Sequence, residues 1–312
     1  MKILYITTGV EDYLSDGILY GLRKLYGPDV VDFPKKESMY VNYQEDISYG
    51  SGFTLWRLLP DLNIDREHVR EQIEAGYYDI IVFSDIFRQL EVFAHWNVYK
   101  LLEQTREMGK KIVFLDGTDD GKVTITETFQ WGTYFKRENP FNYPEVKIIG
   151  LSIPQEKILP EKPKKTKPFV RYCQVPEAYQ VWEIQQMCSN ERFADETEYY
   201  ADMAASKFGF AMKKSGWDTP RTIEQAGCWA VNCIYTPGWE WDNIDWYHRP
   251  KDTHPLGLED MKNCILWDTP QQLVDKIKSI NDVQYEKMSR DSHDWALTKT
   301  CEKVARYVMD NI

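Results

Sequence analysis

Short apolar runs alternate with segments of helical periodicity along residues 1–154. Runs rich in β-forming residues predict buried strands at 2–8, 29–33, 78–84, 111–115 and 146–151. Apolar residues at helical spacing predict helices over 17–26, 65–75 and 92–108, the second with Asp65 as its N-cap. Buried strands separated by helices are typical of parallel βαβ units, so this half of the chain predicts a Rossmann-like domain.

A stretch rich in proline and lysine follows, and then a second α/β pattern begins. We expect an N-terminal domain over 1–160, a linker over 161–168 and a C-terminal domain over 169–312. The second pattern predicts strands at 169–175, 231–235 and 264–267 and helices at 178–189, 196–206, 219–229, 270–280 and 284–310. The predicted fold class is α/β, with two Rossmann-like domains facing a cleft and the C-terminal helices packing back toward the N-terminal domain. In such sheets, ligands bind beyond the carboxyl ends of the strands.

Composition and charge narrow the classes of function. The net charge of -11 argues against a broad basic face for duplex DNA or RNA, although it leaves room for a local basic pocket. No run reaches the roughly 18 apolar residues that a membrane span needs. The 6 cysteines form no C-x-x-C pair, and we interpret them as reduced thiols of a cytoplasmic protein. Aromatic residues make up 14% of the chain, and they either build cores or stack on sugars and bases.

The segment SKFGFAMKKSGWDTPRTIEQAGCWA, residues 206–230, contains the strongest candidate site. Lys213, Lys214 and Arg221 surround the start of a predicted helix that Thr219 would cap. Cations and free backbone N–H groups at a helix N-terminus together bind anions. Glu224, one turn into the helix, is placed to accept hydrogen bonds from a ribose diol. The alternative is an ordinary solvated helix start with surface lysines.

The longer segment KKSGWDTPRTIEQAGCWAVNC resembles the donor-binding region of GT-B glycosyltransferases, in particular group 1 and CgeB-like members. The segments SDGILYGLRKLYGPDVVDFPKK, GSGFTLW, FLDGTDD and YFKRE extend the resemblance over most of the chain. The resemblance implies transfer of a sugar from a nucleoside diphosphate sugar to a hydroxyl acceptor, without a metal or other cofactor. The sequence QAGCWA at 225–230 departs from the more usual small-residue stretch, and Gly216 replaces the first acid of an E-x7-E pair. The stereochemistry of transfer therefore stays open.

The same resemblance assigns the donor site. Glu224 matches the ribose-binding glutamate, and Arg221 with Lys213 matches the diphosphate contacts. The full donor set is Lys213, Lys214, Trp217, Arg221, Thr222 and Glu224.

Carboxylates that follow predicted strands are the candidates for catalysis. Asp16 is placed to take the proton of the acceptor hydroxyl in an inverting reaction, with Glu11 and Asp12 as rivals, or it simply caps a helix. Asp119 and Asp120, in LDGTDD, are further candidates for a base or for acceptor binding, although this loop also has the composition of a turn. We expect no D-x-D metal site there, because the donor-like segment is C-terminal.

Four residues are expected to bind the acceptor. They are Asp12, the basic pair Lys136 and Arg137, and His254, which lies in a loop predicted to face the cleft. The basic pair also has the composition of an ordinary surface segment. Residues 229–247 hold four Trp and two Tyr, which form either a platform for a sugar ring or a small aromatic core.

The possible functions differ mainly in the acceptor of the sugar. A saccharide is the first choice. The second is a hydroxymethylated pyrimidine in phage DNA, bound along a small basic groove of Lys35, Lys36 and the lysines of 162–167. A third hypothesis, from another class, is a non-catalytic relative that binds a nucleotide-sugar without transferring it.

Overall fold

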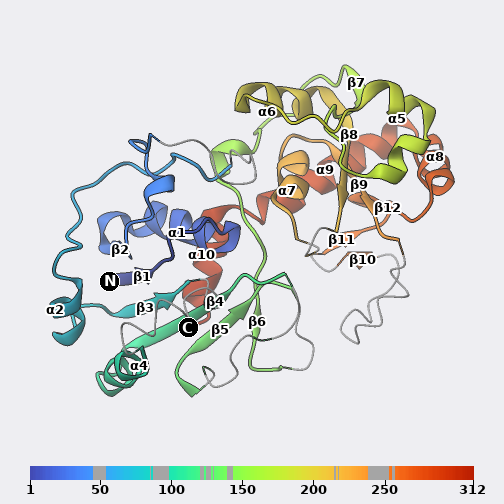
Figure 1. The fold of residues 1–312 in the computed structure, drawn as a ribbon. Coiled ribbons are helices and arrows are strands. Elements are labelled where there is room, and N and C mark those ends of the chain that lie inside the picture. Colours follow the sequence, from blue (N-terminus) through green and yellow to red (C-terminus); the bar gives the residue numbers. More distant parts are fainter. Residues whose placement is uncertain are drawn as a thin grey trace. The chain divides into compact units, whose positions relative to one another are not determined.

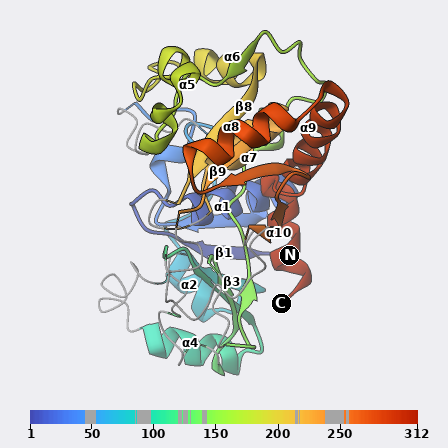
Figure 2. The same cartoon turned by 90° about the vertical axis from the view of Figure 1, so that its right-hand side faces the viewer.

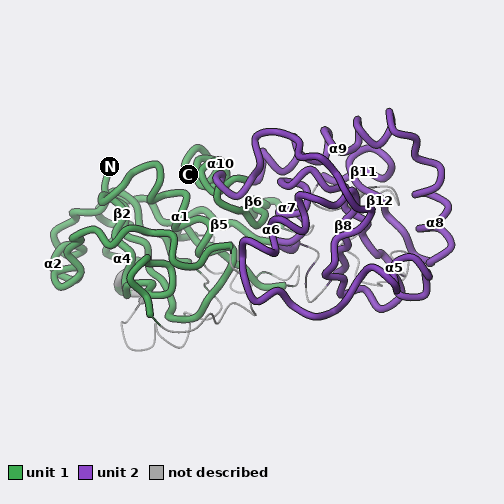
Figure 3. The backbone as a smooth tube through the Cα atoms, turned by 90° about the horizontal axis from the view of Figure 1, so that it is seen from above, with its two compact units in different colours: residues 1–154, 300–312 green, residues 155–299 purple. Residues whose placement is uncertain are grey.

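The fold of the 312-residue chain is given by a computed structural model (Figure 1). It describes all residues except 45–53, 85, 87–97, 120–122, 124–127, 129, 139–142, 214, 215, 217, 238–252, 255 and 256. The chain divides into two compact units, coloured separately in Figure 3. Unit 1 comprises residues 1–154 and 300–312, and unit 2 comprises residues 155–299.

Unit 1 contains a six-stranded parallel sheet with the strand order β2-β1-β3-β4-β5-β6. Strands β1 and β3 are buried along their whole length, as continuous apolar runs predict. In register, Ile3 of β1 lies opposite both Val30 of β2 and Ile80 of β3. The strands are β1 (Ile3–Ile6), β2 (Val30–Phe33), β3 (Ile80–Phe83), β4 (Lys111–Asp116), β5 (Thr133–Lys136) and β6 (Lys147–Ile148).

The first and last helices of the chain pack together in unit 1, as Figures 1 and 2 show. A β-carbon at Gly21 of α1 would lie only 2.0 Å from the carbonyl oxygen of Cys301, so glycine permits the close approach of α10. The expected return of the C-terminus to the first half of the chain is therefore confirmed. The helices of this unit are α1 (Tyr13–Tyr26), η1 (Gly27–Asp29), η2 (Glu37–Met39), α2 (Val69–Glu74), α4 (Val98–Glu107) and α10 (Cys301–Asp310).

Unit 2 is built on a four-stranded parallel sheet in the order β12-β9-β8-β7. Its strands are β7 (Lys167–Phe169), β8 (Ser206–Met212), β9 (Val231–Tyr235) and β12 (Cys264–Trp267), and a separate hairpin pairs β10 (Thr253–His254) with β11 (Leu258–Glu259). Its helices are η4 (Gln155–Lys157), η5 (Pro176–Gln180), α5 (Trp182–Met187), α6 (Glu196–Ala205), α7 (Pro220–Gly227), α8 (Pro270–Ser279) and α9 (Asp282–Leu297).

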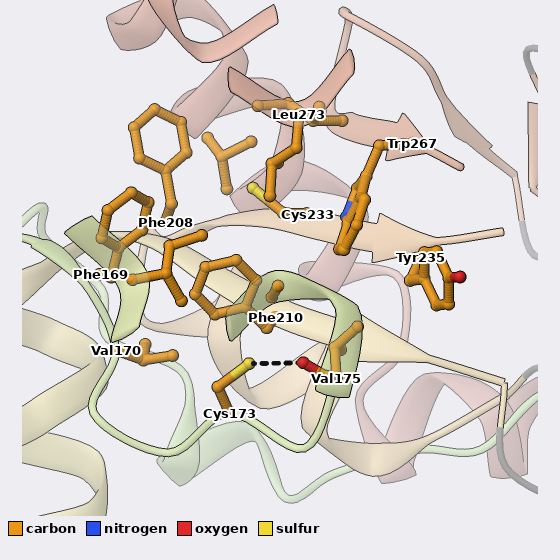
Figure 4. Close-up of a cluster of buried hydrophobic side chains, with 14 of the residues drawn as sticks. Phe169, Val170, Cys173, Val175, Phe208, Phe210, Cys233, Tyr235, Trp267 and Leu273 are labelled. Atoms are coloured by element: carbon orange, nitrogen blue, oxygen red, sulfur yellow. Dashed lines mark hydrogen bonds between the residues drawn. The ribbon is translucent and has the colours of Figure 1, made fainter. Parts of the chain in front are cut away.

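Aromatic side chains form much of the core of unit 2 (Figure 4). Phe169 packs between Phe208 and Phe210, with ring centroids 6.2 and 5.5 Å apart. Tyr235 and Trp267 pack against each other at 4.6 Å. Part of the high aromatic content is therefore used in the core of this unit.

The segment expected as the end of the N-terminal domain and the linker is instead part of unit 2. The N–H of Leu159 donates to the carbonyl of Gly227 at 3.0 Å. Its own carbonyl accepts from Nε1 of Trp229 at 3.0 Å and meets Nε2 of His293 at 2.8 Å. These bonds fasten residues 155–168 to α7 and α9, which is why the division falls at Pro154 rather than at 160.

Several secondary-structure predictions were wrong in detail. The predicted strand at 169–175 is β7 at Lys167–Phe169, and β8 at Ser206–Met212 was not predicted as a strand. The single predicted helix at 284–310 is two helices, α9 and α10, which belong to different units. Helix α2 starts at Val69, because Asp65 hydrogen-bonds the N–H groups of Glu67 and His68 in a turn of its own. Among the described residues, no helix is long and apolar enough to cross a membrane.

Candidate functional site

The loop after β1 meets the loop after β4 at the carboxyl edge of the unit 1 sheet. Asp12 caps α1, with its Oδ1 accepting the N–H of Ser15 at 2.8 Å. A β-carbon on Gly117, just after β4, would lie 2.9 Å from Oδ2 of Asp12. The partly exposed Asp12 carboxylate therefore lies so close to Gly117 that a β-carbon there would displace it.

Asp16, the first candidate for the base, is fully enclosed by protein. Its side chain is 0% exposed, and Oδ1 lies 3.1 Å from Nζ of Lys36, which is also buried. Nζ of Lys36 additionally donates to the backbone carbonyls of Thr8, at 3.1 Å, and Val10. Burial raises the pKa of Asp16 to about 7, although Lys36 opposes the shift. The Asp12 carboxylate is thus better exposed than that of Asp16.

A second buried ion pair lies at the ends of β4 and β5. Nζ of Lys136 is 3.4 Å from Oδ1 of Asp116, and both side chains are 0% exposed. The same ammonium donates to the carbonyl and to Oγ1 of Thr118, each at 2.7 Å. Lys136, expected at the acceptor, therefore holds the loop after β4 in place.

Arg137 and Asp119 form an ion pair at the same edge. Their side chains are 10% and 46% exposed, so the Asp119 carboxylate is open to solvent. Arg137 also lies 3.5 Å from Oε1 of Glu138, whose backbone has a positive φ of 36°. The structure thus joins two predicted site residues, Arg137 and Asp119. Asp120 lies outside the described residues.

The donor segment begins at the carboxyl end of β8 in unit 2. Lys213 follows the last residue of β8, and Thr219 is the N-cap of α7. The hydroxyl of Thr219 meets that of Thr222 at 3.0 Å and does not cap the helix with a side-chain hydrogen bond. Thr222 itself is buried, and its carbonyl accepts from Asn232 at 2.9 Å. The other predicted residues of this site, Lys214 and Trp217, and the side chain of His254 lie outside what the structure describes.

Arg221 and Glu224 lie one turn apart on α7. Arg221 donates from Nη1 to Oε1 of Gln174 at 2.9 Å, and its Cζ lies 4.5 Å from the centre of the Tyr172 ring. Oε2 of Glu224 accepts the hydroxyl of Tyr199 at 2.5 Å. Glu224 is only 4% exposed, and burial raises the pKa of its carboxyl. Burial acts against the charge of Arg221, but Tyr199 and Glu224 outweigh it and raise the pKa of Arg221.

Sequence patterns missed the residues that surround these side chains. Tyr199 comes from α6, and Tyr172 and Gln174 follow β7. No spacing links these positions to α7, because contacts between different elements depend on the packing of the sheet and its helices. In the described part of the chain, no group of three or more His, Cys, Asp or Glu is placed to hold a metal ion.

The predicted residues thus gather in two sets. In unit 1, Asp12, Asp16, Asp119, Lys136 and Arg137 lie at the ends of β1, β4 and β5. In unit 2, Lys213, Thr222, Arg221 and Glu224 lie at or beyond the end of β8. Both sets occupy the sheet edge where α/β proteins bind ligands, or the helix that starts there.

Solved structures share this architecture. A glycosyltransferase from Rickettsia africae ESF-5 matches with a TM-score of 0.53 and 7% identity, over 99% of this chain and 97% of that one. Sucrose-phosphate synthase from Thermosynechococcus elongatus matches with a TM-score of 0.51 and 11% identity, over 100% and 98%. A chain of the GtfA/B complex is less similar, with a TM-score of 0.42 and 12% identity over 80% of this chain, which spans only 60% of that chain's length.

No family model and no curated protein significantly matches the sequence. The likeness to the first two structures extends over nearly the whole length of both partners. The chain has two α/β units, each with a parallel sheet, as the sequence predicts. The chain therefore has a two-domain GT-B fold.

Proposed function

We propose that the protein transfers a sugar from a nucleoside diphosphate sugar to a hydroxyl acceptor. The observation that carries this proposal is the whole-length likeness to a glycosyltransferase, with 99% and 97% of the two chains covered. The charged residues at the strand ends of each unit supply the groups that such a reaction needs. A fold alone hosts several activities, so the proposal depends on these side chains.

The donor would bind at the start of α7. Lys213, Arg221 and the backbone N–H groups of the helix N-terminus would neutralise the diphosphate, which carries more negative charge as it leaves. Glu224 would accept hydrogen bonds from the ribose hydroxyls. This assignment uses charges of the protein to stabilise the leaving group, and we propose that no metal ion is needed.

The acceptor would bind at the carboxyl edge of the unit 1 sheet. Asp12 is better exposed than Asp16, so we propose it as the base in place of the enclosed Asp16. In an inverting reaction it would take the hydroxyl proton while the acceptor oxygen bonds to the anomeric carbon and the bond to the diphosphate breaks. Asp119 and Arg137 would bind acceptor hydroxyls, and Lys136 would hold their loop in place.

The charges favour a saccharide over DNA as the acceptor. Three of the lysines expected to line a basic groove are engaged within their own units. Lys36 is buried against Asp16, Lys162 binds Glu286 at 2.7 Å, and Lys165 donates to the carbonyls of Ala204 and Cys228. A phosphate backbone needs clustered cations that face solvent. Filter binding over a range of salt concentrations tests the alternative, because DNA binding should weaken steeply with salt.

A panel of UDP-, GDP- and dTDP-linked hexoses tests the proposal itself. Thermal shift should identify a donor that stabilises the protein, and chromatography should then detect transfer or slow hydrolysis of that donor. Binding without any turnover, over a broad panel of saccharide acceptors, would instead support the non-catalytic relative. Addition of EDTA should leave turnover unchanged if no metal ion takes part.

A further inference from the structure

Tyr199 contacts one of the side chains assigned to the donor and influences another. It comes from α6, and its hydroxyl donates to Oε2 of Glu224 at 2.5 Å. It also raises the pKa of Arg221, which lies one turn before Glu224 on α7. A single phenol therefore binds the carboxylate and acts electrostatically on the guanidinium of the proposed donor helix.

The ring of Tyr199 is itself fixed by aromatic neighbours. It meets Phe193 edge to face at 5.6 Å and Tyr200 at 5.4 Å. Such contacts restrict the ring independently of its hydroxyl. The Tyr199 hydroxyl thus has a defined position from which to orient the two charged groups.

We propose that Tyr199 is a positioning residue of the donor site, which holds the Glu224 carboxylate and the Arg221 guanidinium in the orientation that the nucleotide requires. The inference rests on the proposed function and deepens it. Glu224 is only 4% exposed, so its carboxylate can present an oxygen to a ribose only in a narrow range of orientations. Without the hydroxyl, Arg221 and Glu224 can pair directly, because side chains three residues apart share one helix face.

Tyr199 also influences the pKa of Glu224. Burial raises the pKa of Glu224, and the hydrogen bond from Tyr199 opposes that rise. The positive charges of Arg221 and Lys157 also lower the pKa of Glu224, whereas the negative charge of Glu196 raises it. Removal of the Tyr199 hydroxyl should therefore move the pKa of Glu224 further upward, and with it the pH below which the ionised carboxylate is lost.

Tyr199→Phe removes the hydroxyl and keeps the ring. A matched control is Tyr285→Phe, which removes a phenolic hydrogen bond to the carbonyl of Lys207 in the same unit. With the hexose donor that stabilises the wild type, titration calorimetry should show a roughly tenfold weaker affinity for Tyr199→Phe at pH 7 and no change for Tyr285→Phe. The acidic limit of donor binding should shift to higher pH in Tyr199→Phe alone.

A double substitution separates positioning from general loss of structure. In a Glu224→Gln background, Tyr199→Phe should have little further effect on donor affinity, because the carboxylate that it orients is gone. Wild-type affinity and an unchanged pH profile in Tyr199→Phe would overturn the inference while leaving the proposed function intact. Equal losses in Tyr199→Phe and Tyr285→Phe would overturn it as well. Failure of the wild type to bind any donor of the panel would overturn the proposed function and the inference together.

Discussion

Nζ of Lys36 lies 3.1 Å from Oδ1 of Asp16, and both side chains are buried in unit 1. The pair joins the first turn of α1 to the chain that follows β2. A buried charge is tolerated only when it is paired and hydrogen-bonded, and Lys36 meets two backbone carbonyls as well. Asp16 thus serves the fold at the position where the sequence predicts a base.

Asp16→Asn should change how stability depends on pH. The pKa of Asp16 is about 7 in the folded protein and near 3.8 when unfolded, so the folded state binds the proton more tightly. The wild type therefore loses stability relative to the variant as pH rises from about 4 to about 7, by up to about 4 kcal/mol. Urea denaturation of both proteins between pH 4 and pH 9 measures this difference. A difference that stays constant over that range would contradict the shifted pKa.

Gly117→Ala should impair catalysis through Asp12. The added β-carbon would lie 2.9 Å from the Asp12 carboxylate and displace it. We expect the turnover number to fall about tenfold or more, since small displacements of a catalytic group are costly. Affinity for the donor, which is assigned to unit 2, should be unchanged. Gly9→Ala is the control, because a β-carbon there meets nothing within 4 Å. Equal turnover in both variants would argue against Asp12 as the base.

Arg221→Ala should slow transfer. The guanidinium is assigned to the leaving diphosphate, and loss of one such group typically costs about a hundredfold in rate. Arg221→Lys should recover only part of the rate, because an ammonium lacks the planar fork of donors. Arg290→Ala on the exposed face of α9 is the control. Steady-state kinetics measure the loss of rate, and melting temperatures of the same variants show whether they remain folded. Full activity in Arg221→Ala would exclude the assignment.

Gly21→Ala should destabilise unit 1. The new β-carbon would lie 2.0 Å from the carbonyl oxygen of Cys301 and 2.7 Å from Cβ of Ala305, so α10 must move away from α1. Overpacking of this kind costs about 3 kcal/mol. Chemical denaturation of the wild type, Gly21→Ala and the control Gly9→Ala measures the loss in free energy of unfolding. A loss of less than about 0.5 kcal/mol would contradict the close packing of the two helices.

Much of the fold could be predicted from the sequence, because buried parallel strands are continuous apolar runs. β1 and β3 were identified in this way. β8 was not, because Gly209 in SKFGFAM has the appearance of a turn. In the structure a β-carbon at Gly209 would lie 2.3 Å from the Gln225 side chain, so this glycine lets α7 pack closely on the strand. A sequence pattern cannot distinguish a glycine for a turn from a glycine for close packing.

The candidate site was predicted less well than the fold. Lys136 was predicted to bind the acceptor, but its buried partner Asp116 lies on a neighbouring strand, and the sequence does not show that pairing. Tyr199 was not identified, because it reaches Glu224 from another helix. Spacing along one element places residues on one face, whereas contacts between elements depend on three-dimensional packing.

The central claim is that the start of α7 binds a nucleoside diphosphate sugar. Titration calorimetry of the wild type and Glu224→Ala, with the hexose donor selected by thermal shift, tests it most directly. We predict measurable binding by the wild type and at least about tenfold weaker binding by Glu224→Ala, with the fold retained by circular dichroism. Unchanged donor affinity in Glu224→Ala, or no binding of any nucleotide-sugar by the wild type, would contradict the claim.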